Sequence, residues 1–224
     1  MRFQQDGITV TWLQGGLWIR WDSGGILLDA PPAAALLGAE LGHLRAIALT
    51  SGRIQAVGGL LGVLAATDRW RDPGLALPIH IALGEERASL VAETWQRGWP
   101  QAFPVELDAE APGARFELGP FEVRTISVSA AEPDFRAGTT RAIPAVGLQL
   151  RGPIQLAWVP SAAPGPVVEH LCRGADLAVV EVGVLAWPRG AVRLRPEDAI
   201  RAASGARLLW CVGDDGEPID VPGA

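Results

Sequence analysis

The sequence has no lysine and no tyrosine, and it contains three histidines and two cysteines among 224 residues. Cys172 and Cys211 lie far apart, without a CxxC pair or a neighbouring histidine, so neither a zinc knuckle nor a redox pair is indicated. We expect both cysteines to be small buried hydrophobes.

Long apolar runs and excess positive charge are also missing. No run of about 18 apolar residues occurs, and the first residues have neither a basic nor an apolar signal region, so we predict a cytoplasmic protein with no membrane segment. The net charge of -6 argues against a general nucleic-acid surface. All basic side chains are arginine, which, with the richness in Ala, Gly, Leu, Pro and Trp, is typical of a GC-rich bacterial genome. The 49% apolar composition is ample for a globular core.

The first half of the chain reads as hairpins followed by α/β units. Glycine-rich turns separate the predicted strands at 8–13, 17–21 and 25–30, which indicates tight hairpins. A helical segment at 33–41, a buried strand at 44–50, a helix at 57–70 and a strand at 78–83 follow. The last helix, 84–99, is amphipathic, with Leu90, Val91 and Trp95 expected toward the core and Glu85 and Arg87 outward.

The second half repeats this order. Strands are predicted at 103–108, 114–119, 121–129, 145–151, 154–160, 175–182 and 206–212, and helices at 166–174 and 195–204. We therefore predict an α/β fold, an αββα four-layer sandwich of two mixed β-sheets flanked by helices. It forms a single domain over 1–224, with two αβ halves at about 1–110 and 111–213 and a short C-terminal tail.

The order of these motifs resembles the metallo-β-lactamase fold, especially its ribonuclease Z-like and phosphodiesterase-like branches, and it is also similar to the PQQ-biosynthesis protein B-like branch. The likeness rests on segments spread over almost the whole chain. They are "GGILLDA", "LRAIALT" followed by "VGGLLGVL", "GPIQLAWVPSAAP", "GADLAVVEV" and "RPEDAIRAASGARLLWCV".

The resemblance also implies where metal ligands would stand. The family motif His-x-His-x-Asp-His, laid on "TSGRIQA", falls on Ser51, Arg53, Gln55 and Ala56, none of which is a good zinc ligand. The next ligand position falls near Ser127 and Ser129, the bridging aspartate on Pro160 or Ser161, and the last histidine on Cys211 or Val212. We interpret the fold as retained and the dinuclear metal chemistry as lost, and we predict no cofactor.

Other titratable residues do not supply a replacement centre. His43, His80 and His170 have no ligand spacing, and we expect them to be satisfied or exposed histidines. The resemblance gives the aspartate after "ILL", Asp29, the role of fixing neighbouring backbone, and Glu181 is read in the same way.

The loop after the strand at 44–50 has two interpretations. Ser51, Gly52 and Arg53 could bind a small anion at the start of the following helix. Alternatively, Ser51 caps that helix and Arg53 is a solvated surface residue. Arg193 and Arg195 could approach the same edge, or simply form a solvated face.

The leading hypothesis is a non-catalytic protein, a pseudoenzyme that acts as a binding, partner or scaffold subunit. Its ligand-binding positions would be Ser51, Arg53, Gln55, Ser129 and Ser161, and its partner a small anionic ligand, a second copy in a homodimer, or an active homologue in a heteromer. The contact candidates are the tryptophans at four positions: Trp70, Trp95, Trp99 and Trp187. The alternative is a hydrolase of a phosphodiester or related ester with an altered metal site.

Overall fold

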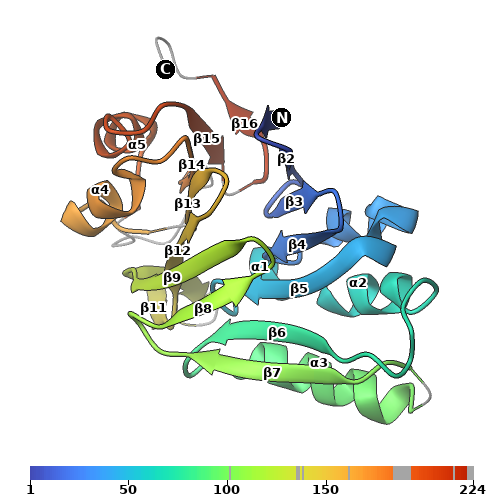
Figure 1. Ribbon diagram of the computed structural model, residues 1–224. Helices are drawn as coiled ribbons and strands as arrows, with labels where there is room; N and C mark the ends of the chain where they lie inside the picture. The colour runs from blue at the N-terminus through green and yellow to red at the C-terminus, as the bar shows by residue number, and fades with distance from the viewer. Residues whose placement is uncertain are drawn as a thin grey trace. The chain divides into compact units, whose positions relative to one another are not determined.

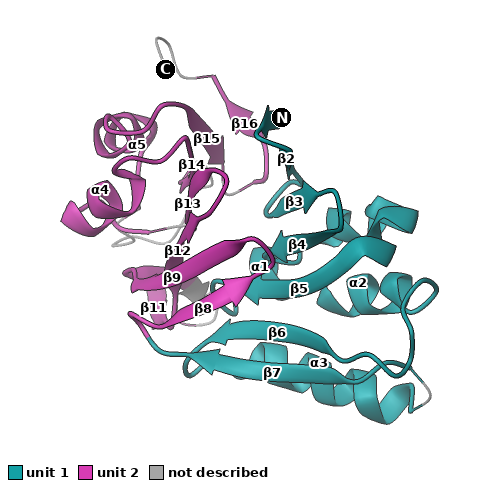
Figure 2. Cartoon of the chain, in the orientation of Figure 1, with its two compact units in different colours: residues 1–111 teal, residues 112–224 magenta. Residues whose placement is uncertain are grey.

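The computed structural model describes residues 1–100, 102–134, 137, 139–160, 162–183, 193–213 and 215–220 (Figure 1). The chain divides into two compact units, unit 1 with residues 1–111 and unit 2 with residues 112–224 (Figure 2). Each unit contains one seven-stranded sheet of its own. The prediction of a mixed α/β fold with two mixed sheets is confirmed.

Unit 1 is built on a sheet whose strands follow one another in chain order. They are β1 (Arg2–Gln5), β2 (Ile8–Trp12), β3 (Leu17–Trp21), β4 (Gly24–Leu28), β5 (Leu44–Leu49), β6 (Leu77–Ala82) and β7 (Val105–Glu110). The pairs from β1 to β4 are antiparallel and those from β4 to β7 are parallel. Both predicted hairpins are confirmed, whereas β1 was not predicted.

The helices of unit 1 connect the parallel strands. They are the 3₁₀ helix η1 (Pro32–His43) and the α-helices α1 (Ile54–Val57), α2 (Leu60–Thr67) and α3 (Arg87–Gly98). Leu60 and Val63 of α2 and Trp95 of α3 belong to one apolar core with Ile47 of β5 and Ile79 of β6. The helices therefore cover the sheet through an apolar side, as a parallel sheet requires.

The helix predicted at 57–70 is present as α2 but is shorter at both ends, and the separate helix α1, before it, was not predicted. Gly58 is the C-cap of α1 and Gly59 is the N-cap of α2. A Cβ atom on Gly59 would overlap the carbonyl of Pro31, so this glycine permits a close approach of two backbones.

The predicted orientation of α3 is partly wrong. The buried face consists of Ala88, Ala92 and Trp95, spaced four and three residues apart, whereas Leu90 is 65% exposed. Glu85 precedes the helix and is buried, contrary to the prediction that it points outward. The error arises because Leu90 was assigned to the core by its hydrophobicity. The buried face of the helix is instead formed by two small alanines, Ala88 and Ala92, together with Trp95.

The described residues of unit 2 form a second seven-stranded sheet, a two-stranded hairpin and two α-helices. The sheet order is β16 (Pro218–Ile219), β15 (Leu209–Gly213), β14 (Leu177–Val182), β13 (Gln155–Val159), β12 (Val146–Arg151), β9 (Phe121–Ser127) and β8 (Arg115–Leu118). The hairpin is β10 (Ala130–Asp134) with β11 (Thr139–Ile143), and the helices are α4 (Pro166–Cys172) and α5 (Pro196–Ala202).

The parallel part of this sheet lies at β13, β14 and β15, and its other pairs are antiparallel. Val168 of α4 and Ala199 of α5 share a buried apolar core with Val180 of β14 and Cys211 of β15. The strands β10, β11 and β16 were not predicted, because they are short and carry little apolar alternation.

None of the helices in the described part of the chain is both long enough and apolar enough to cross a membrane.

Candidate functional site

The candidate site in unit 1 begins where β5 ends, and Asp29 fixes its first residue. Asp29 has a positive φ of 57° and is buried directly after β4. Its carboxylate accepts hydrogen bonds from the Thr50 amide at 2.7 Å and from the Thr50 hydroxyl at 2.9 and 2.8 Å. The predicted structural role of Asp29 is confirmed, since it ties the ends of β4 and β5 together.

The residues that follow Thr50 form a buried loop and the short helix α1. Ser51 is 1% exposed and Arg53 is 3% exposed, so the alternative that Arg53 is a solvated surface residue is wrong. Arg53, not Ser51, is the N-cap residue of α1, and no side chain caps that helix. The Ser51 hydroxyl instead accepts a long hydrogen bond of 3.4 Å from the Arg53 amide.

The other two positions of the same motif lie within α1. Gln55 is half-buried on this helix, and Ala56 is buried. The Ala56 carbonyl accepts a hydrogen bond of 2.6 Å from the Ala30 amide, so the helix is also attached to the segment after Asp29. A helix of four residues contributes little dipole to an anion site, which leaves the guanidinium of Arg53 as the only strong charge of this loop.

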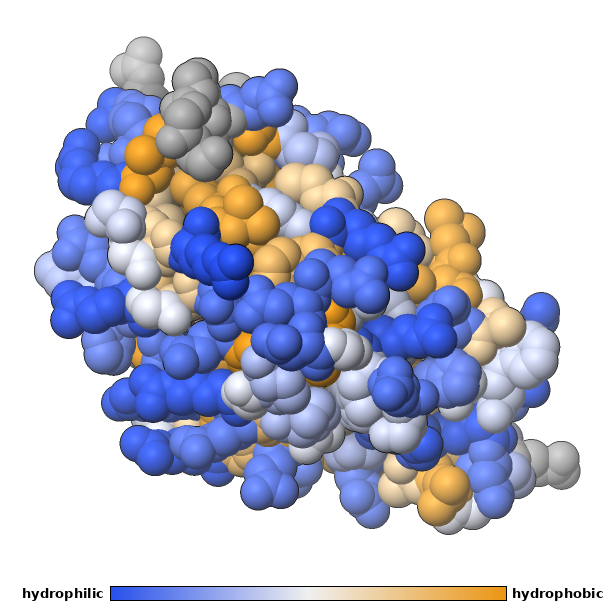
Figure 3. All heavy atoms as spheres, turned by 45° about the horizontal axis from the view of Figure 1, so that its top comes forward, coloured by the Kyte–Doolittle hydropathy of each residue, from blue (hydrophilic) through white to orange (hydrophobic). Residues whose placement is uncertain are grey.

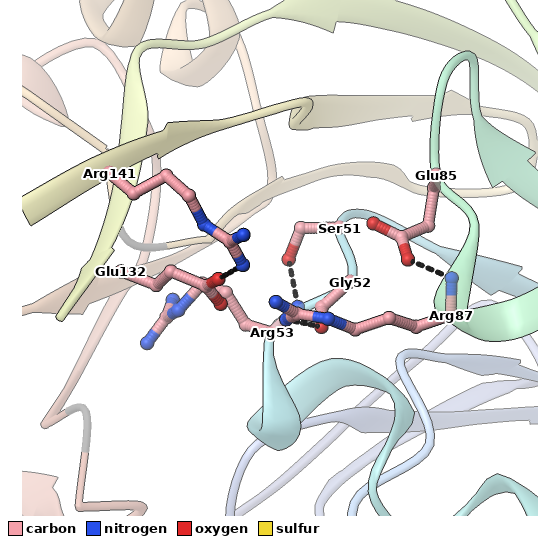
Figure 4. A network of polar contacts seen from close by, with 7 residues as sticks. All are labelled: Ser51, Gly52, Arg53, Glu85, Arg87, Glu132 and Arg141. Carbon is pink, nitrogen blue, oxygen red and sulfur yellow. Dashed lines mark hydrogen bonds and ion pairs between the residues drawn. The ribbon is translucent and has the colours of Figure 1, made fainter. Parts of the chain in front are cut away.

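Two charged residues contact Gly52: Glu85, in the turn after β6, and Arg87, the first residue of α3 (Figure 4). A Cβ atom on Gly52 would collide with the Glu85 carboxylate, which is buried against this glycine. Glu85 Oε1 accepts a hydrogen bond of 2.6 Å from the Arg87 amide, and Arg87 Nη1 donates one of 2.5 Å to the Gly52 carbonyl. We name Glu85 and Arg87 the Gly52 clamp.

The sequence did not identify the Gly52 clamp, because both residues were assigned to the outer face of a helix. The sequence does contain one signal for this contact, which is Gly52, the glycine two residues after Thr50 at the end of the predicted buried strand. Glycine at such a position indicates that another group approaches the backbone closely.

In unit 2, a backbone hydrogen bond joins Ser129, one of the predicted ligand positions, to the loop after β13. The Ser129 carbonyl, between β9 and β10, accepts a hydrogen bond of 2.9 Å from the Ala163 amide in the loop after β13. Pro160 in the same loop is buried, whereas the side chains of Ser127 and Ser129 are exposed. Ser161, the remaining predicted position, lies outside the described residues.

The ends of β14 and β15 carry the last ligand position. Glu181 on β14 pairs in register with Val212 on β15, and both are buried, as is Cys211. Burial raises the pKa of the Cys211 thiol to about 11. The thiol is therefore protonated at neutral pH and is a poor nucleophile and a poor metal ligand.

Arg193 and Arg195 differ in their surroundings within unit 2. The Arg193 guanidinium packs against Gly183, where a Cβ atom would lie 2.9 Å from Cζ. Arg195 is exposed at the start of α5, where it lies 3.2 Å from Glu197 and 3.3 Å from Asp198. The solvated face predicted for Arg195 is confirmed.

Elsewhere in unit 2, the cross-strand partners Glu132 and Arg141 form an ion pair on the β10–β11 hairpin (Figure 4).

The histidines do not form a metal site. His80 Nδ1 lies 2.8 Å from Glu110 Oε1 on the neighbouring strand, which satisfies this ring nitrogen. His43 and His170 are exposed. Each histidine therefore lies in one of the two environments that we expect for it.

The side chains at the four loop positions Ser51, Arg53, Gln55 and Ala56 do not fit a dinuclear metal centre. A hydroxyl, a guanidinium, an amide and a methyl group stand at the four loop positions, and zinc binds imidazole, thiolate and carboxylate ligands. Within the ranges that the structure covers, no group of three or more His, Cys, Asp or Glu side chains could hold a metal ion.

The tryptophans differ in their availability for contact. Trp70 is 56% exposed and Trp99 is 46% exposed, whereas Trp95 is buried, so its selection as a contact residue is wrong. Trp99 stacks on Trp95 with ring centroids 5.1 Å apart. Trp187 lies outside the described residues. Hydrophobic residues also lie among hydrophilic ones on the face drawn in Figure 3.

No protein-family model matches the chain, and no curated protein sequence does. Solved structures do match. The metallo-β-lactamase fold protein YhfI from Bacillus subtilis is 14% identical with a TM-score of 0.66, over 88% of this chain and 76% of that one. The short form of human tRNase Z is 14% identical with a TM-score of 0.65, over 88% and 83%.

A third match is the Zn²⁺-bound PqqB from Methylobacterium extorquens, 17% identical with a TM-score of 0.54, over 88% of this chain and 64% of that one. These three proteins include representatives of two of the three branches that the sequence resembles. The chain has the metallo-β-lactamase fold.

Proposed function

We propose that this protein is a non-catalytic member of the metallo-β-lactamase fold and works by binding a protein partner. One observation carries the proposal: at the positions where the fold resemblance puts metal ligands, the loop after β5 carries Ser51, Arg53, Gln55 and Ala56. The guanidinium of Arg53 is a permanent cation, and it would repel a divalent metal ion in the same loop.

The internal contacts of this loop support the same proposal. Asp29 engages Thr50, and the Gly52 clamp engages Gly52, so these polar groups already have partners within unit 1. A catalytic loop needs polar groups that can meet a substrate, with a nucleophile beside a base. The loop from Thr50 to Ala56 contains no histidine that could serve as a base for Ser51. The Ser51 hydroxyl accepts a hydrogen bond from the Arg53 amide.

A protein partner suits the observations better than a small anion. Arg53 would have to bind that anion, but only 3% of this residue is exposed, which leaves little surface for an incoming ligand. The partner would be a second copy or an active homologue, and the exposed Trp70 and Trp99 are the contact residues that we propose. We also propose a cytoplasmic location, which two free, unpaired cysteines support.

The alternative function is a hydrolase with an altered metal site. Its support is that the human tRNase Z, an enzyme by name, has the same fold. Fold does not determine function, because one fold carries many chemistries, so the two proposals must be separated by experiment.

The test measures metal content and hydrolysis together. Untagged protein, purified from cells grown with added zinc, manganese and iron, should contain no stoichiometric metal by elemental analysis. It should also fail to hydrolyse bis(p-nitrophenyl) phosphate above the rate of buffer with any of the three ions. A tRNase Z purified in the same way serves as the positive control for hydrolysis, and PqqB as the control for zinc retention. One or two metal ions per chain, or metal-dependent turnover, would contradict the proposal.

A separate measurement addresses the partner. Light scattering after size-exclusion chromatography gives the oligomeric state, and a second copy predicts a dimer. The double variant Trp70→Ser with Trp99→Ser should shift the dimer toward monomer, whereas Leu90→Ser, at a similarly exposed apolar residue on α3, should leave it unchanged. If the wild-type protein is a monomer, immobilised protein should retain a homologue of this fold from its native lysate. A wild-type monomer that also retains no homologue of this fold would refute the binding role.

A further inference from the structure

The loop from Thr50 to Ala56 is positioned by side chains from two other segments of unit 1. Asp29, after β4, holds Thr50 through three hydrogen bonds. The segment from the turn after β6 to the first residue of α3 holds Gly52 through the Gly52 clamp. Both attachments lie within the first three residues of the loop, at the point where the chain leaves the sheet.

The Gly52 clamp has a chemistry suited to holding backbone. The guanidinium of Arg87 donates to the Gly52 carbonyl, which makes a charge-assisted hydrogen bond. The Glu85 carboxylate fills the space that a Cβ atom would take on the same residue, so only a glycine leaves room for it. Because the two residues carry opposite charges and lie two positions apart in the chain, the clamp adds no net charge beside Gly52.

A metal ion would fix such a loop in a different way. Coordination of several side chains by one ion couples metal binding to local order, so the loop loses order when the ion is removed. The Thr50–Ala56 loop lacks that ligand set, and the clamp acts on its backbone rather than on its side chains.

We propose that Glu85 and Arg87 are positioning residues that keep the Thr50–Ala56 loop ordered without any metal ion. The clamp then makes the shape of this loop independent of chelators and of added zinc. This inference concerns the order of the loop, and it holds whether the protein is a binding subunit or a hydrolase.

Amide hydrogen exchange in the full-length protein, measured by NMR in EDTA, tests the clamp. The reporters are the amides of Ala56 and Val57, which donate to the Arg53 carbonyl at 2.9 and 3.0 Å. Arg87→Met keeps the aliphatic stem and removes the donor. We expect these amides to exchange about tenfold faster in this variant, as loss of one hydrogen bond from a charged group predicts.

The matched control is Arg97→Met on the same helix. Arg97 forms an exposed ion pair of 3.3 Å with Glu93, and such a pair contributes little to order. Exchange in the loop should be unchanged in this variant. A urea titration of each protein separates local opening of the loop from a general loss of stability.

A second pair of variants tests the Glu85 side of the clamp. Gly52→Ala places a methyl group against the Glu85 carboxylate, so it should lower the urea midpoint and speed exchange in the loop. Glu85→Ala removes the colliding atoms, and Gly52→Ala should then change the midpoint much less.

Three outcomes would overturn the inference. They are equal loop exchange in Arg87→Met and wild type, an effect of Gly52→Ala that does not depend on Glu85, and wild-type loop amides that become protected only when Zn²⁺ is added. The first two outcomes do not depend on the metal content or hydrolysis results, so they overturn this inference alone. The third would count against the proposed function as well.

Discussion

At the scale of single residues, the two cysteines combine burial with a shifted ionisation. Cys172 and Cys211 are free and buried, as the sequence predicts. Burial raises the pKa of Cys172 to about 12 and that of Cys211 to about 11, because the thiolate loses its hydration in an apolar core. Both residues therefore act as small hydrophobic side chains at neutral pH.

The raised pKa values predict a loss of stability in alkali. In the unfolded chain a cysteine thiol loses its proton near pH 9. In the folded protein Cys211 loses its proton near pH 11 and Cys172 near pH 12. Between these values the folded state binds more protons, so the free energy of unfolding falls as the pH rises. Lysine and tyrosine are absent from the chain, so the thiols dominate this pH window.

Urea titrations at pH 8, 10 and 11 measure this slope. The double variant Cys172→Ala with Cys211→Ala should show a clearly weaker decline than wild type. Identical slopes would mean that groups other than the thiols govern stability in alkali.

At the scale of elements, the break between α1 and α2 shows what the glycines do. Gly59 lies where the backbone meets the Pro31 carbonyl, while Gly62 lies inside α2, where an added Cβ would be 3.5 Å from the Ala35 Cβ. The first glycine is required by a close approach, and the second meets only ordinary van der Waals contact.

These two glycines predict opposite effects of the same substitution. Gly62→Ala should stabilise the protein by about 0.5 to 1 kcal/mol, because alanine is the better helix former. Gly59→Ala should destabilise it by about 1 to 3 kcal/mol, as expected when a methyl group is forced into a filled space. Thermal and urea unfolding of both variants show whether each substitution raises or lowers the free energy of unfolding. A loss of stability in Gly62→Ala would refute this assignment.

The same distinction explains how much could be predicted from the sequence. Apolar periodicity and glycine turns predicted the β2–β3–β4 hairpins, the buried β5 and the order of α/β units, because these signals are local. The Gly52 clamp depends on residues 33 and 35 positions apart, and no local pattern reveals such a contact. Arg53 was misjudged for the same reason, since its type predicts exposure and only tertiary structure determines its burial.

At the scale of the whole molecule, each sheet is made from the strands of one unit. The chain passes from unit 1 to unit 2 at Ala111 and Pro112, both exposed, between β7 and β8. Exposed connections of this kind tolerate insertions and are accessible to proteases.

Cleavage at this connection should therefore leave the secondary structure in place. A protease site inserted between Ala111 and Pro112, then cut completely, should keep the far-ultraviolet circular dichroism of the intact protein. The same site inserted inside β5, after Ile47, should prevent folding, since it interrupts a buried central strand. Loss of the signal after the first cut would show that the connection itself stabilises the fold.

The Gly52 clamp also limits how this protein could be redesigned. Replacing Ser51, Arg53, Gln55 and Ala56 by three histidines and an aspartate would supply ligands, but Glu85 and Arg87 would still set the backbone path at Gly52. A metal ion tolerates only a narrow range of ligand geometries. Conversion of this loop into a metal centre would therefore require redesign of the turn after β6 together with the loop itself.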